Sequence, residues 1–122
     1  MQKDGVVWIA RRAAWICVLI LAVLSWTPGD EMIRTGAPGA LEHVAAYLIT
    51  GGIVAVGYGS QVGYWLSALL LCAWAGVLEM GQFWVPGRHA QLIDFAASSL
   101  GAILGISSVA AYRWRPWLRR WF

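Results

Sequence analysis

Polar and ionisable side chains interrupt three apolar segments of the sequence, and these residues are the ones that could carry chemistry. His43 opens one segment, and Glu79 stands late in the next. Asp94 stands early in the last segment, after Arg88 in the connecting stretch. Histidine and carboxylate groups suit proton transfer, and arginine suits anion stabilisation. A carboxylate inside a membrane span costs about 2.5–3.5 kcal/mol, so its presence there calls for a function or a partner.

Helical spacing places further polar residues on the same faces as these groups. Tyr47 follows His43 by four residues, and Ser98 follows Asp94 by four. Gln82 follows Glu79 by three. Side chains at these spacings lie on one helix face. Each pair can therefore face the interior of a helix bundle.

The segments that position these residues are long and apolar. The chain has 122 residues, of which 60% are hydrophobic and 12% charged, a composition typical of membrane proteins. We predict one domain over residues 1–122, with spans at about 6–26, 41–58, 63–85 and 90–112 and a basic aromatic tail at 113–122. Each span is long enough to cross about 30 Å of hydrocarbon. The predicted fold class is an all-α membrane protein, a four-transmembrane-helix bundle with a turn at Gly59-Ser60-Gln61.

The distribution of basic residues predicts the orientation. The ends of the chain carry Lys3, Arg11, Arg12, Arg113, Arg115, Arg119 and Arg120, whereas the opposite loops carry Arg34 and Arg88. By the positive-inside rule both termini are cytoplasmic, and the polar residues lie at the outer end of the spans. The alternation of Trp with Arg in the tail fits anionic lipid headgroups rather than nucleic acid. Membrane lipids are therefore the expected partners, and a homo-oligomer stays open.

Small residues provide places where helices can approach closely. Gly51 and Gly52 lie in the second span, and Ala97, Gly101 and Gly105 recur every four residues in the fourth. Such spacing allows close backbone contact between membrane helices.

The stretch from His43 to Gly105 resembles the VanZ-like family of bacterial envelope proteins. The family pattern has a His near the start of one span, a Glu-x-x-Gln in the next, and a loop Arg followed by an Asp. Here these elements are His43-Val-Ala-Ala-Tyr47, Glu79-Met-Gly-Gln82, Pro86-Gly87-Arg88 and Asp94. An Asp-Lys pair that commonly precedes the family His is missing, and Ser98 stands where the family often has an Asn.

The resemblance implies a bacterial inner-membrane protein of the cell envelope. The family takes its name from a member associated with reduced susceptibility to the glycopeptide teicoplanin. Most members have no assigned reaction, so the resemblance implies envelope biology and not a particular chemistry.

Taken together, these observations predict an outward-facing polar pocket for a lipid or a cell-wall-linked ligand. The predicted ligand-binding residues are His43, Tyr47, Glu79, Gln82, Arg88, Asp94 and Ser98. One alternative is an intramembrane hydrolase or transferase in which His43 or Glu79 is the acid–base residue, and another is a dimeric proton-coupled carrier. A structural alternative pairs Arg88 with Asp94 or Glu79. A metal site of His43, Glu79, His89 and Asp94 is left open, although neither a metal nor another cofactor is expected.

Overall fold

The computed structural model describes residues 2–32 and 35–115, and within them every long element is a helix. The long helices are α1 (Gln2–Trp26), α2 (Gly39–Val62), α3 (Tyr64–Gly81) and α4 (Leu92–Trp114). Two short 3-10 turns, η1 (Gly29–Glu31) and η2 (Gln82–Trp84), follow α1 and α3. No strand occurs in the described residues. The predicted all-helical class is therefore confirmed.

Four helical segments of the described chain are long and apolar enough to cross a membrane. They are Lys3–Trp26, Gly39–Val62, Tyr64–Trp84 and Leu92–Trp114, with 21 to 24 residues each. At 1.5 Å per residue such segments measure about 32–36 Å, slightly more than the hydrocarbon thickness. These helices are those of a multi-pass membrane protein by length and composition.

The helix bounds differ from the predicted spans at several ends. α4 begins at Leu92 and continues to Trp114, so the first two residues of the predicted tail belong to this helix. Residues 116–122, which hold most of that tail, lie outside the described residues, as does Arg34.

The turn predicted at Gly59-Ser60-Gln61 is wrong. α2 continues through these residues to Val62, and the chain reverses at Gly63, whose φ is 97°. This left-handed conformation favours glycine because a Cβ atom would strain it. Gly59 instead leaves room for the Tyr64 ring that packs against it, because a Cβ atom at Gly59 would collide with that ring.

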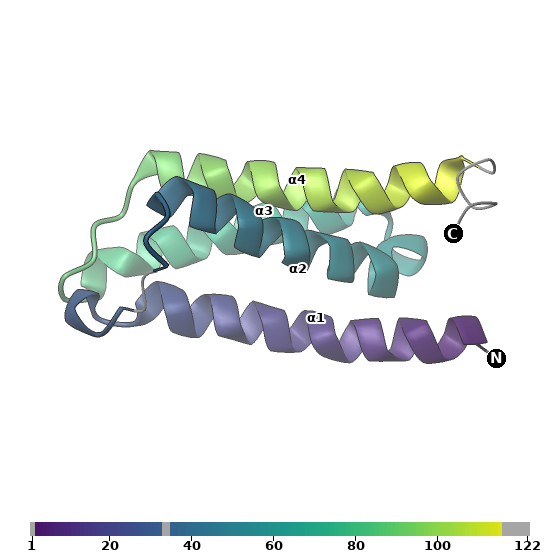
Figure 1. Ribbon diagram of the computed structural model, residues 1–122, viewed down its shortest axis with the longest axis horizontal. Coiled ribbons are helices and arrows are strands. Elements are labelled where there is room, and N and C mark those ends of the chain that lie inside the picture. The colour runs from purple at the N-terminus through teal and green to yellow at the C-terminus, as the bar shows by residue number, and fades with distance from the viewer. Residues whose placement is uncertain (1, 33–34, 116–122) are drawn as a thin grey trace.

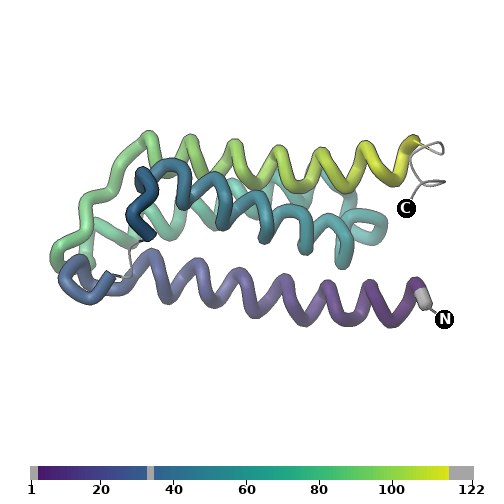
Figure 2. Tube along the Cα trace, in the orientation of Figure 1, coloured from purple at the N-terminus to yellow at the C-terminus, as the bar shows by residue number. Residues whose placement is uncertain are grey.

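The helices form an elongated bundle in which α2 and α4 lie side by side (Figure 1). α3 packs against α4 and α2, and α1 lies along α2. The connections from α1 to α2 and from α3 to α4 lie together at one end, which we call the loop end (Figure 2). The α2–α3 turn and both described chain ends lie at the opposite end, which we call the terminal end.

The contact between α2 and α4 depends on glycine. A Cβ atom at Gly51 would come within 2.7 Å of the Ala102 carbonyl oxygen. Cβ atoms at Gly101 and Gly105 would collide with the carbonyl oxygens of Val44 and Leu48. The predicted small-residue contact is confirmed, because at these positions only glycine allows the two backbones to approach so closely.

The core is narrow and the outer surface is apolar. Buried apolar side chains from all four helices meet along the bundle axis: Leu21, Tyr47, Ala55, Leu71, Ala75, Leu78, Ala102 and Ile106. Large apolar side chains also point outward, and Leu19, Leu69 and Leu100 are each more than half exposed. An outward apolar surface of this kind is expected where lipid surrounds the helices.

Arginine side chains of α1 and α4 bind the C-terminal half of α2. The Arg11 Nε donates to the Gly57 carbonyl at 2.8 Å. Arg113 donates to the Ala55 and Val56 carbonyls at 3.3 and 3.0 Å. These carbonyls lie one to two turns before the end of α2, and each receives a charged hydrogen-bond donor from a neighbouring helix.

Candidate functional site

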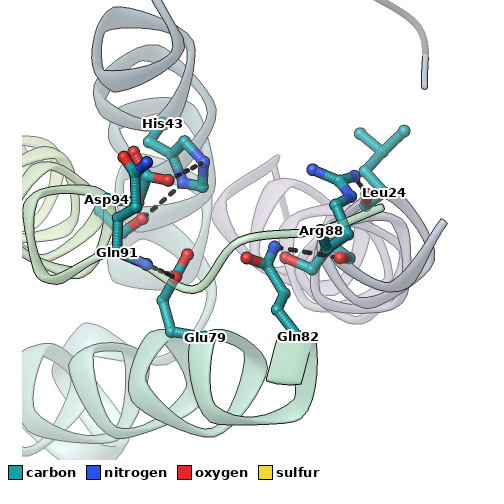
Figure 3. A network of polar contacts seen from close by, with 9 residues as sticks. Leu24, His43, Glu79, Gln82, Arg88, Gln91 and Asp94 are labelled. Carbon is teal, nitrogen blue, oxygen red and sulfur yellow. Dashed lines mark hydrogen bonds and ion pairs between the residues drawn. The ribbon is translucent and has the colours of Figure 1, made fainter. Parts of the chain in front are cut away.

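The polar cluster at the loop end begins with a contact between α2 and α4. His43 lies in the second turn of α2, and Asp94 lies in the first turn of α4. The His43 Nδ1 lies 3.0 Å from the Ser98 Oγ, one turn beyond Asp94. The His43 Nε2 lies 3.9 Å from the Asp94 Oδ2 (Figure 3). The face of α4 predicted from the Asp94–Ser98 spacing is thus the face that meets His43.

Glu79 reaches this cluster from the last turn of α3. Its side chain is buried, and its Oε2 accepts a hydrogen bond of 3.1 Å from the backbone N–H of Gln91. Because Gln91 precedes α4, the positive end of the α4 dipole faces this carboxylate. One potential ligand atom from each of His43, Glu79 and Asp94 lies within 4.8 Å of the other two.

The cluster has unused capacity for a cation or a proton. Among the described residues, no hydrogen-bond donor reaches the Asp94 carboxylate, and its one polar contact is the 3.9 Å approach to His43. Asp94 and His43 are nevertheless partly buried, with side chains 19% and 23% exposed. Buried charged groups are normally paired or coordinated, so this arrangement favours an additional ligand.

A second polar group joins the α3–α4 connection to the end of α1. The Gln82 Nε2 donates to the Ser25 carbonyl at 3.0 Å, and the Arg88 Nε donates to the Thr27 carbonyl at 2.8 Å. The Arg88 guanidinium also hydrogen-bonds to the Leu24 carbonyl. Carbonyls at the end of a helix lack partners within it, so Gln82 and Arg88 satisfy the end of α1. Figure 3 shows both side chains directed toward α1.

A cleft of about 750 Å³ lies between the two groups. His43, Asp94 and Arg88 contribute polar side chains to its wall, and Leu21 and Leu24 contribute apolar ones from α1. The α1–α2 connection lines it as well, through residues that include Gly39. The cleft therefore combines charge with an apolar wall.

The seven predicted ligand-binding residues all lie at the loop end, but they do not share one role. Those that line the cleft are His43, Tyr47, Gln82, Arg88 and Asp94. Glu79 and Ser98 lie behind this wall, where Ser98 is 2% exposed.

Sequence reasoning missed the parts of the site that come from the backbone. The Gln91 N–H holds Glu79, and the Leu24 and Thr27 carbonyls hold Arg88. Backbone groups carry no residue-type signal, so only the N-terminal position of Gln91 relative to an expected helix could have indicated its role.

The fold and the site define an all-helical protein whose four apolar helices gather a polar cluster and a cleft at one end. Comparison with protein-family models, with curated proteins and with solved structures finds no match to this chain.

Proposed function

We propose that this chain is a VanZ-like integral membrane protein of the bacterial inner membrane, with both termini in the cytoplasm. In this proposal the cleft at the loop end faces outward and binds a lipid or a cell-wall-linked ligand. The orientation is supported by the charge count, because Lys3, Arg113 and Arg115 lie at the terminal end and Arg11 and Arg12 lie in the half of α1 nearer to it. The family is supported by the meeting of His43, Glu79 and Asp94, three residues of the motif, in one cluster.

The amphiphilic cleft is the observation that carries the proposal. Its volume of about 750 Å³ lies within the range of about 300–1,000 Å³ typical of ligand sites. The Arg88 guanidinium offers positive charge to an anionic head group, while Leu21 and Leu24 offer an apolar wall to a chain. A polyprenyl phosphate, the lipid carrier type of cell-wall precursors, combines both features.

A variant that fills the cleft tests this proposal. Gly39 lines the cleft, and a Cβ atom there meets nothing within 4 Å, so Gly39→Trp should narrow the cleft without disturbing the backbone. Gly5→Trp is the matched control, because a Cβ at Gly5 also meets nothing within 4 Å and Gly5 lies outside the cleft. Native mass spectrometry of protein in nanodiscs that contain polyprenyl phosphate should show bound lipid lost in Gly39→Trp only.

A susceptibility assay links the cleft to envelope biology. We propose that expression of the protein alters teicoplanin susceptibility and that Gly39→Trp removes the effect while Gly5→Trp retains it. Equal lipid occupancy and equal susceptibility in both variants would argue against the cleft as the binding site.

The close approach of His43 and Glu79 favours a second candidate, an intramembrane hydrolase or transferase. A histidine and a carboxylate at this distance suit general acid–base catalysis on a lipid-linked substrate. Turnover by purified protein over lipid-linked phosphates, lost in His43→Asn, would support it. If the protein binds lipid but no turnover is detected, the enzyme hypothesis is rejected and the lipid-binding proposal is retained.

A further inference from the structure

We propose that His43, Glu79 and Asp94 form a binding site for one divalent transition-metal ion, of which Zn²⁺ is the representative. The three residues come from α2, α3 and α4 respectively, so the ion would join three helices at the loop end. This inference does not depend on which ligand the cleft accepts.

The donor atoms lie at distances that one cation can close. One atom from each residue lies within 4.8 Å of the other two. Ligands at about 2.0–2.2 Å from Zn²⁺ in tetrahedral geometry are roughly 3.3–3.6 Å apart. Shifts of about 1 Å in the positions of the side-chain donor atoms bring them to that spacing. Imidazole with carboxylate is a donor set suited to Zn²⁺ and Mn²⁺.

The cluster lacks protein partners where a cation would bind. Within the described residues, neither the Asp94 carboxylate nor the His43 Nε2 takes part in a hydrogen bond, and the 3.9 Å contact between them is too long for one. Glu79 and Asp94 also place two carboxylates beside each other at the end of apolar helices. A divalent ion offsets the repulsion between them and gives the imidazole lone pair a partner.

Surrounding groups orient the donors as they do in known metal sites. With its proton on Nδ1, His43 donates to the Ser98 Oγ at 3.0 Å and directs the Nε2 lone pair toward Asp94 (Figure 3). The Gln91 N–H holds one oxygen of Glu79 at 3.1 Å. Metal-ligating histidines and carboxylates are typically fixed by such outer hydrogen bonds.

The site has an open side. His43 and Asp94 line the cleft, whereas Glu79 lies behind them. Three protein ligands with the remaining position free is the arrangement of catalytic rather than structural zinc sites. That free position would accept water or an anionic oxygen from the cleft.

Metal binding by the purified full-length protein in detergent tests the proposal. After chelator treatment, titration with Zn²⁺ and elemental analysis should give one ion per chain. His43→Asn and Glu79→Gln should each weaken binding by more than about 100-fold, because each removes a ligand, and Ser98→Ala should weaken it by about 10–100-fold through loss of orientation.

Matched controls use the other His and a cleft carboxylate. His89→Asn and Glu42→Gln change residues that line the cleft but lie outside the cluster, so they should leave Zn²⁺ affinity within about twofold of the unmutated protein.

Co²⁺ titration of the unmutated protein, followed by visible absorption, keeps the test independent of whether a variant folds. Intense bands that saturate at one Co²⁺ per chain support the site. Failure of the unmutated protein to bind either ion, or equal loss in His43→Asn and His89→Asn, overturns it.

Discussion

Replacement of Gly51 by alanine should separate α2 from α4. The new Cβ would lie 2.7 Å from the Ala102 carbonyl oxygen, whereas ordinary contacts begin near 3.4 Å, so the backbones must part by about 0.7 Å. A gap of 0.5–1 Å removes a quarter to a half of the attraction between facing atoms. Overpacking of this kind typically costs about 1–3 kcal/mol.

Gly52→Ala is the control for this experiment. Its Cβ would meet only the Gly105 carbonyl oxygen, at 3.9 Å, which is an ordinary contact. Both variants replace glycine by alanine in the same helix, so the gain in helix propensity of about 1 kcal/mol is common to both. The difference between the variants therefore isolates the close approach of the two helices, and we expect it to be about 2 kcal/mol.

Thermal unfolding followed by circular dichroism in detergent measures the difference. We expect Gly51→Ala to melt roughly 6–12 °C below Gly52→Ala. Gly105→Ala should melt no higher than Gly51→Ala, because its Cβ would collide with the Leu48 carbonyl and lie 2.8 Å from the Gly52 nitrogen. If Gly51→Ala and Gly52→Ala melt together, the backbones do not pack as closely as described, and the reasoning fails.

Three further experiments test the loop end and the orientation. Arg88→Ala should lower the free energy of unfolding by about 1.5–3 kcal/mol because the Leu24 and Thr27 carbonyls lose a charged donor, and Arg88→Lys should recover only part of it, as measured by the same melting assay. Trp26→Phe should cost about 1 kcal/mol through loss of the 3.1 Å hydrogen bond to the Leu78 carbonyl; an unchanged Tm would show that this bond contributes nothing. Green fluorescent protein fused after the C-terminus should fluoresce while alkaline phosphatase at the same place stays inactive, and the reverse result would invert the proposed topology.

Much of the fold could be predicted because it depends on lengths of apolar sequence. The spans follow from runs that must cover about 30 Å of hydrocarbon, and the depth of His43, Glu79 and Asp94 follows from counting along each span. The α2–α3 turn could not be predicted in the same way. Gly59 and Gly63 are both acceptable turn residues, and their residue type does not distinguish them: in the structure Gly63 has the positive φ, whereas Gly59 leaves room for the Tyr64 ring.

The site was predictable only in part. Residue types and helix faces indicated that His43 and Asp94 would meet, because both lie near the starts of helices at the same end. The end of α1 gave no such indication, since Arg88 binds it through backbone carbonyls that any residue possesses. A prediction from side chains therefore places Arg88 near the acids without showing its role at α1.

The arginine contacts at the two ends of the bundle couple the direction of insertion to the completeness of folding. Arg11 and Arg113 reach carbonyls of α2 at the terminal end, and Arg88 reaches carbonyls of α1 at the loop end. If α1 entered the membrane backwards, Arg11, three residues from the middle of α1, would move by about 9 Å along the helix axis and lose its contact with Gly57, and Arg88 would face the wrong end of α1. A bundle with α1 reversed would lose these hydrogen bonds at both ends, so the direction of α1 relative to the other helices is tied to the completion of the arginine contacts.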